Sequence, residues 1–256
     1  METLKNEIMN SQTILAGMSH EMRTYMNAIV AFSFLMQESS FDNEEREEFS
    51  NHIFNSCEQM MQLFDSFFES IRIDAGNSVT KSKICNVDIM LDDLILEFKK
   101  VIRKDVEKKI ELITEIKVDT STRALVDIKM IDRIMRSLFL NSLKNTSSGY
   151  IKIGLSNTND ELVFSVHDTG KGFVKSRDFL NSGNINESLS KHDDLAGAIN
   201  INLIRKIVEI MRGTIWIEHN DIEGTGFFIS IPVKLFTGFN TSLNDVVFNS
   251  AVTCNY

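Results

Sequence analysis

The sequence predicts an α+β protein in which an antiparallel helical hairpin, forming a four-helix bundle in a dimer, is followed by a two-layer α/β sandwich. Residues 1–74 carry apolar side chains at alternating spacings of three and four, the heptad pattern of packed helices. From about residue 83 onward, helical patterns alternate with short strand patterns, which favours helices packed on a sheet. The chain has 256 residues, enough for two modest domains.

Composition and charge narrow the classes of function. The formal net charge of −9 does not favour a nucleic-acid partner, whose phosphates need cationic groups. The sequence contains no apolar run long enough for a transmembrane helix, and its first residues do not resemble a signal peptide. The cysteines, Cys57, Cys85 and Cys254, match no metal or disulfide spacing. We therefore expect a cytoplasmic protein, or a cytoplasmic fragment of a longer one.

The first helix is expected over residues 1–37, and its heptad pattern places one histidine on the outer rim. When Met22 takes position a and Met18 and Tyr25 take position d, His20 falls at f, the position furthest from the seam. Most exposed polar side chains on a helix take part in no chemistry, so an inert surface histidine is the plain alternative. The heptad pattern therefore predicts an accessible imidazole, and its neighbours decide whether it reacts.

Two neighbours of His20 favour chemistry. Glu21 can accept a hydrogen bond from a ring N–H, which makes the other ring nitrogen more basic. Thr24 lies one helical turn further on, so its hydroxyl covers the same face as the ring and could position a water molecule. These residue types at this spacing suit transfer of a group to or from the imidazole.

The second helix of the hairpin is expected to begin after Asp42, with Glu45 completing a capping box. The hairpin ends near Gly76, because glycine commonly terminates helices. A single hairpin cannot cover its own apolar seam, so a homodimer through residues 1–74 is expected. The alternative is that the hairpin packs on the second domain of its own chain.

The second domain is expected over residues 83–235, leaving residues 236–256 as a tail of unknown role. Three segments have helical periodicity and five have the alternation or apolar runs of strands. The expected helices cover residues 88–101, 127–145 and 203–211, and the expected strands cover residues 110–116, 150–155, 162–167, 214–218 and 227–232.

The segment Ser19–Ile29 closely resembles the H box of sensor histidine kinases, usually written S-H-E-x-R-T-P-L-x-x-I. The resemblance implies that His20 accepts a phosphoryl group, that Glu21 is the general base and that Thr24 supports hydrolysis of the phosphorylated regulator. Tyr25 stands where the family usually has proline, so bending of the helix near His20 should be harder. The resemblance covers residues 1–76 as a dimerisation and histidine-phosphotransfer hairpin.

The second domain resembles the GHKL-type ATP-binding domain shared by histidine kinases, gyrases and Hsp90-type chaperones. The helix that ends near Asn145 is similar to the N box of this family, which implies that Asn141 ligates Mg²⁺ between the ATP phosphates. Lys144 would then meet phosphate charge. An asparagine that only closes a helix is the alternative for Asn141.

A second resemblance of this domain lies in its glycine boxes. Asp168 opens a D-x-G-x-G box, and the resemblance implies that its carboxylate accepts from the adenine amino group. Gly170 and Gly172 would let the chain turn closely against the base. The segment Gly224-Thr225-Gly226-Phe227 resembles the last glycine box of the family, which implies a further contact to the nucleotide from Thr225.

The phosphate box of the family, G-x-G-L-G-L, has lost its glycines in this sequence. It falls on Ala196–Ile201, where the one glycine, Gly197, is displaced by one position. Added Cβ atoms obstruct the approach of backbone N–H groups to phosphate. Asp193 and Asp194 bring negative charge to the same place. We therefore expect ATP to bind weakly.

The resemblance implies a two-component sensor histidine kinase core. With ATP and Mg²⁺, the γ-phosphoryl group would pass to His20 and then to an aspartate of a response-regulator receiver domain. One alternative is a pseudokinase or histidine phosphotransfer adaptor that makes little or no use of ATP. Another is a dimeric signalling scaffold in which His20 is inert.

Overall fold

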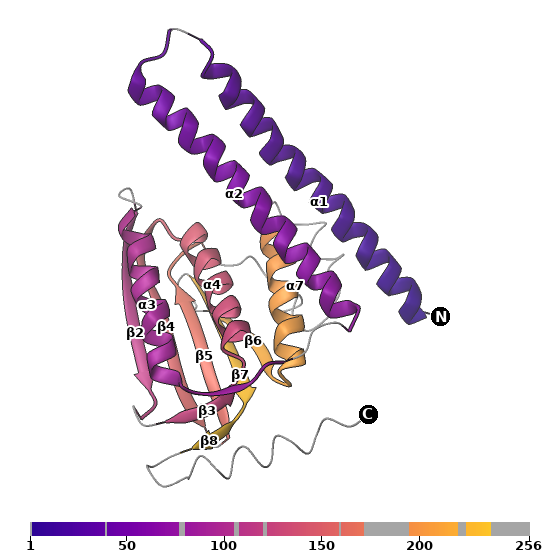
Figure 1. Ribbon diagram of the computed structural model, residues 1–256, viewed down its shortest axis with the longest axis vertical. Coiled ribbons are helices and arrows are strands. Elements are labelled where there is room, and N and C mark those ends of the chain that lie inside the picture. The colour runs from indigo at the N-terminus through magenta and orange to yellow at the C-terminus, as the bar shows by residue number, and fades with distance from the viewer. Residues whose placement is uncertain are drawn as a thin grey trace. The chain divides into compact units, whose positions relative to one another are not determined.

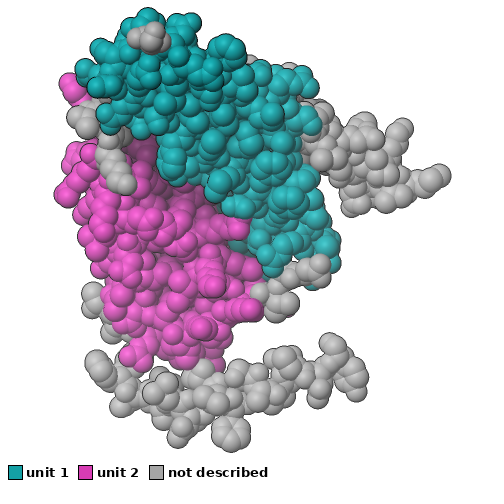
Figure 2. All heavy atoms as spheres, turned by 45° about the horizontal axis from the view of Figure 1, so that its top comes forward, with its two compact units in different colours: residues 1–79, 173–210 teal, residues 80–172, 211–256 magenta. Residues whose placement is uncertain are grey.

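The computed structural model describes residues 2–38, 40–76, 80–104, 108–119, 122–158, 160–171, 195–219 and 224–236 (Figure 1). The chain forms two compact units (Figure 2), one made of residues 1–79 and 173–210 and the other of residues 80–172 and 211–256. The first is called the hairpin unit below, and the second the sheet unit.

The hairpin unit contains the helices α1 (Glu2–Leu35), α2 (Asn43–Asp74) and α7 (Leu195–Ile210). Helices α1 and α2 are antiparallel neighbours (Figure 1). As predicted, Asp42 caps α2: its carboxylate accepts from the backbone N–H groups of Glu44 and Glu45 at 2.9 Å, and the Glu45 side chain accepts from the Asp42 N–H at 3.0 Å. This capping box fixes the start of α2.

The helices of the hairpin unit share a small apolar core. Met18, Leu63 and Ile199 are buried together, one from each helix, and Tyr25 packs against them from α1. Tyr25 lies within an α1 that is continuous from Glu2 to Leu35, as expected for a residue that keeps its N–H in the helical ladder. None of the described helices is both long and apolar enough to cross a lipid bilayer.

The sheet unit has two helices and two sheets, with bounds as follows. Its helices are α3 (Val87–Lys104) and α4 (Ile128–Asn145). The larger sheet has the strand order β2-β4-β5-β7-β6, formed by Lys109–Lys117, Ser148–Thr158, Glu161–Asp168, Thr225–Pro232 and Thr214–His219. The smaller sheet has the order β1-β3-β8, formed by Lys83–Asn86, Arg123–Val126 and Lys234–Phe236.

The core of the sheet unit lies between the larger sheet and its two helices (Figure 1). Strand β5 illustrates the two faces of this sheet, because alternate side chains from Leu162 to Asp168 are buried while those between them are partly exposed. The rings of Phe98 on α3 and Phe139 on α4 stack with centroids 3.9 Å apart and join the helix layer. The fold class expected from the sequence is confirmed, because two helices cover one face of this sheet.

The elements depart from the sequence prediction in two places. The smaller sheet was not predicted, because its strands have three or four residues and so give too few repeats of the alternation. Helix α7 begins at Leu195 rather than near Leu203. The segment Ala196–Ile201, expected as a phosphate loop, is therefore the first part of a helix, since it contains no proline and only one glycine.

Candidate functional site

The sheet unit holds a buried carboxylate where β5 ends. Asp168 is only 7% exposed, and its Oδ2 accepts a hydrogen bond from the Ser142 hydroxyl of α4 at 2.8 Å. The backbone N–H of Gly170 donates to Oδ1 at 3.0 Å, and the N–H of Thr225 donates to the same carboxylate. Burial raises the pKa of Asp168, and these hydrogen bonds oppose the rise only in part.

Two glycines allow the backbone to close tightly around Asp168. A Cβ added to Gly170 would overlap the carbonyl of Asn145, and the next N–H in the turn, that of Lys171, donates to this carbonyl at 3.2 Å. Gly224 has φ +107°, a conformation that side chains rarely adopt, and an added Cβ would overlap the carbonyl oxygen of Asp168. The turn after β5 is thus fixed against the end of α4.

The last turns of α4, the helix that donates to this carboxylate through Ser142, carry two amide side chains. Asn141 is half-buried, and Asn145 donates through Nδ2 to the Asn141 carbonyl oxygen at 2.8 Å and lies 3.4 Å from Asn141 Oδ1. Lys144 is exposed. The buried hydroxyl of Thr146 has no hydrogen-bond partner among the described residues. Asn145 was missed in the sequence, although its spacing of four from Asn141 places it on the same helical face.

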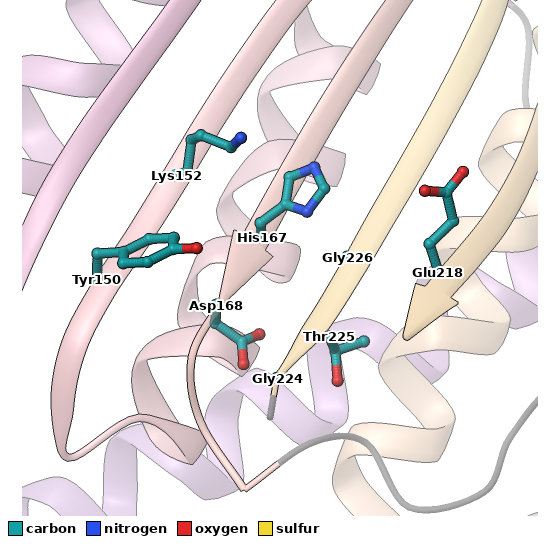
Figure 3. A pocket seen from close by; sticks show the side chains of 8 residues that line it. All are labelled: Tyr150, Lys152, His167, Asp168, Glu218, Gly224, Thr225 and Gly226. Atoms are coloured by element: carbon teal, nitrogen blue, oxygen red, sulfur yellow. The ribbon is translucent and has the colours of Figure 1, made fainter. Parts of the chain in front are cut away.

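A pocket of about 150 Å³ opens beside Asp168 (Figure 3). The strand register sets Lys152, His167, Gly226 and Glu218 in one row across β4, β5, β7 and β6. Burial and the charge of Lys152 lower the pKa of His167. These residues were not predicted from the sequence, because the row exists only once the strands are paired. The pocket is lined by Tyr150, Lys152, His167, Asp168, Glu218, Gly224, Thr225 and Gly226.

In the hairpin unit, α1 carries the predicted phospho-acceptor segment. His20 is exposed, while Met18, two residues earlier, is 4% exposed and faces the core. Glu21 is half-buried, and the Thr24 hydroxyl donates to the His20 carbonyl oxygen at 3.2 Å. Thr24 is thus held one turn from His20, with its oxygen still able to accept from a water molecule.

The remaining predicted residues divide between the two units. Asn141, Asp168, Gly170 and Thr225 lie around one turn of the sheet unit, whereas Gly197 is buried in α7 of the hairpin unit. Gly172, with Asp193 and Asp194 of the sequence prediction, lies outside the described residues. In α7, the side chain of Asn200 accepts from the Ser66 hydroxyl of α2 at 2.8 Å.

The donor set of the sheet unit fits an adenine nucleotide with Mg²⁺. A buried carboxylate, that of Asp168, can accept a hydrogen bond from an amino group, and Gly170 and Gly224 let the backbone close around it. The amide oxygen of Asn141 is a hard, neutral ligand of the kind Mg²⁺ takes while it keeps several waters. The amide of Asn145 lies beside it. The fit rests on these side chains of α4 and β5.

Two family comparisons agree with this geometry. Residues 126–235 match the family described as histidine kinase-, DNA gyrase B- and HSP90-like ATPase. Residues 10–76 match the His Kinase A (phospho-acceptor) domain. The sheet unit residues around Asp168 fall in the first match and His20 in the second.

Proteins of similar sequence are also sensor or histidine kinases. The autoinducer 2 sensor kinase/phosphatase LuxQ of Vibrio cholerae is 25% identical over 233 residues, which is 86% of this chain and 26% of LuxQ. The histidine-protein kinase BarA of Escherichia coli is 25% identical over 229 residues, covering 86% of this chain and 24% of BarA. The chain thus spans about a quarter of the length of these relatives.

The fold is also that of solved histidine kinases. The solved chain of the histidine kinase AdeS of Acinetobacter baumannii superposes with a TM-score of 0.62 at 18% identity, covering 83% of this chain and 97% of the solved one. ThkA, solved in complex with the response regulator TrrA, gives a TM-score of 0.63 at 21% identity over 85% of this chain and 60% of that chain. With a phospho-acceptor domain followed by a histidine-kinase-type ATPase domain, the chain belongs to the sensor histidine kinases.

Proposed function

We propose that this chain is the catalytic core of a two-component sensor histidine kinase, which transfers the γ-phosphoryl group of ATP to His20 and then to an aspartate of a response regulator. The observation that carries the proposal is the pairing of an exposed histidine on α1 with a buried, glycine-flanked carboxylate, Asp168, in one chain. In domain terms, residues 1–76 would serve dimerisation and phosphotransfer, and residues 83–235 would bind ATP.

In the sheet unit, Asp168 would accept from the amino group of adenine, and Thr225 would contact the nucleotide beside it. Asn141 would hold Mg²⁺ between the phosphates and Lys144 would meet their charge. The bound Mg²⁺ would offset negative charge on the phosphates during transfer. These roles are supported by the burial of Asp168 and by the position of Asn141 one residue before Ser142, whose hydroxyl donates to Asp168.

In the hairpin unit, a ring nitrogen of His20 would attack the γ-phosphorus. The bond from that phosphorus to the bridging oxygen would break, ADP would leave, and Glu21 would accept the proton from the other ring nitrogen. Thr24, held one turn away, would place a water molecule for hydrolysis of the phosphorylated regulator. The exposure of His20 supports this role, because both the nucleotide and a receiver domain must reach the same ring.

The homodimer is supported by apolar side chains that a single hairpin leaves exposed. They recur at spacings of four on α1 and seven on α2, as expected for rows on one face of each helix, and exposure of large apolar side chains in such rows marks an interaction surface. The exposed residues are Met26, Val30 and Phe34 on α1, and Phe54, Met61 and Phe68 on α2.

The receiver partner is supported by one solved neighbour, ThkA, whose structure contains the response regulator TrrA. The charge and the absence of a nucleic-acid motif give no support to a nucleic-acid partner. A cytoplasmic location suits both ATP and a receiver domain. The tail, residues 236–256, has no role in the proposal.

The proposal is tested by incubating the chain with γ-labelled ATP and Mg²⁺. We expect acid-labile label on the wild type, its loss in His20→Gln, and its retention in His52→Gln, since His52 is an exposed histidine on α2. Label that survives in His20→Gln would refute the acceptor assignment.

A second incubation, with a phosphorylated receiver, separates the proposed kinase from the alternatives. Failure of label from ATP together with transfer from the receiver would identify a phosphotransfer adaptor. Failure of both would leave a scaffold.

A further inference from the structure

Helix α4 carries a hydroxyl at a position where its neighbours are apolar. Its buried side chains recur at helical spacing toward the larger sheet, and the last of the row is Ser142, which is fully buried. The other members of the row are Ile131, Ile134, Met135, Leu138 and Phe139. The Ser142 hydroxyl donates to Asp168 Oδ2 at 2.8 Å, so it is satisfied by the carboxylate proposed to contact adenine.

The hydrogen bonds to Asp168 differ in one respect that matters for an experiment. The donors from Gly170 and Thr225 are backbone N–H groups, which a substitution leaves in place. Ser142 provides the donor that belongs to a side chain. A donor to the charged form of a buried carboxyl stabilises that form against desolvation. Removal of the Ser142 hydroxyl should therefore favour protonation of Asp168.

We propose that Ser142 is a positioning residue that holds Asp168 as an ionised acceptor, and that it thereby determines the selectivity of the site for 6-aminopurine nucleotides over 6-oxopurine nucleotides. The proposal rests on the proposed function, in which Asp168 contacts the base. An ionised carboxylate only accepts hydrogen bonds, so it pairs with the 6-amino group of adenine and repels a 6-oxo group. A protonated carboxyl carries a donor and can pair with the 6-oxo group of hypoxanthine.

Charged groups near Asp168 do not replace the role of Ser142. On β4 and β5, Lys152 and His167 occupy one row, on the face of the sheet opposite to Asp168. Lys144 at the end of α4 and Lys171 in the turn are both exposed, so solvent screens them. The pKa of Asp168 is raised by burial and lowered by hydrogen bonds, with no ionised side chain among the causes. Hydrogen bonds are thus what opposes the burial-driven rise in the pKa of this carboxyl.

The experiment measures binding of ADP and of inosine diphosphate, which lacks the 6-amino group, between pH 5 and pH 8. We expect wild type to prefer ADP throughout. In Ser142→Ala, the affinity for ADP should fall by roughly tenfold at pH 5 and by less at pH 8, because one hydrogen bond to a charged group is lost. The ratio of ADP affinity to inosine diphosphate affinity should also become smaller. Ser142→Cys keeps the shape of the side chain with a weaker donor, so it should show a smaller shift in the same direction.

The matched control is Ser230→Ala. Ser230 is 6% exposed and donates to the Glu161 carboxylate at 2.5 Å, at the opposite end of β5 from Asp168. Ser230→Ala also removes one hydroxyl hydrogen bond to a carboxylate in the same sheet. The nucleotide affinity of Ser230→Ala should therefore depend on pH as that of wild type does. Profiles of Ser142→Ala and Ser142→Cys that both follow wild type would overturn the proposal, as would an equal change in Ser230→Ala.

A second measurement separates this inference from the proposed function. The ¹³C resonance of the Asp168 carboxyl reports its titration without nucleotide. If wild type fails to bind ADP at pH 8, the proposed function fails, yet the titration midpoint should still lie higher in Ser142→Cys than in wild type. Equal midpoints would overturn the role of Ser142 whatever the nucleotide affinity.

Discussion

Gly224 offers a sharp test of how the backbone closes around Asp168. Its φ of +107° is strained for any residue with a side chain, and an added Cβ overlaps the Asp168 carbonyl oxygen, a backbone atom held in the sheet. The conformational strain costs about 1–3 kcal/mol. Moving a paired strand aside to relieve the overlap costs about 1–3 kcal/mol more. Gly224→Ala should therefore lower the free energy of unfolding of the sheet unit by about 2–6 kcal/mol.

The matched control is Gly149→Ala in the same unit. Gly149 has φ +110°, so the strain is the same, but its added Cβ overlaps the Thr169 side chain rather than backbone. A side chain can rotate, at the loss of the hydrogen bond that Thr169 Oγ1 accepts from the Tyr150 N–H at 3.0 Å. We expect Gly149→Ala to cost about 2–4 kcal/mol, because the lost hydrogen bond adds about 1 kcal/mol to the strain.

Both variants are measured by urea denaturation, followed through the fluorescence of the single tryptophan, Trp216. This residue lies on β6 and stacks on Phe228 of β7 at 5.2 Å, so it reports the sheet unit. Equal destabilisation by Gly224→Ala and Gly149→Ala would show that the backbone overlap at Asp168 has no energetic effect.

Three further predictions follow from other contacts. Phe98→Ala, which removes one ring of the Phe98–Phe139 stack, should lower the free energy of unfolding by about 3–5 kcal/mol in urea denaturation. A double-mutant cycle on Lys206 and Asp74, whose charged groups lie 2.6 Å apart with Asp74 largely exposed, should give a coupling of only about 0.5–1 kcal/mol. Because the pKa of Asp168 is raised, its contribution to stability is lost as pH rises through that pKa; Asp168→Asn should flatten this pH dependence in thermal melts while abolishing ADP binding.

Long periodic segments explain how much of the fold could be predicted. The heptads of α1 and α2 and the capping box at Asp42 are local signals, and the structure contains them. The three strands of the smaller sheet are too short to produce a periodic signal, and they form because β3 can pair with both β1 and β8. The row of Lys152, His167, Gly226 and Glu218 requires the strand register, which no single segment encodes.

The candidate site was predicted from short motifs that resemble those of a known family. Asp168 follows an apolar strand, and the resemblance of its D-x-G-x-G box implied the adenine contact. The position of Ser142 could have predicted a buried hydrogen bond, since a polar residue that continues a buried apolar row of a helix needs a buried partner. Asn145 likewise repeats Asn141 at one helical turn. The identity of the partner, by contrast, depends on tertiary packing and follows only from the structure.

Helix α7 shows what the loss of glycines does to a phosphate-binding segment. Because Ala196–Ile201 lies within a helix that begins at Leu195, only the N–H groups of its first turn are free of intrahelical bonds. The side chain of Asn200 instead accepts a hydrogen bond from Ser66 of α2, so this part of α7 is bonded to the hairpin. A loop that wraps a triphosphate presents several N–H groups at once, and a regular helix cannot. Nucleotide affinity should therefore depend mainly on the adenine end, where Ser142 and Asp168 are intact.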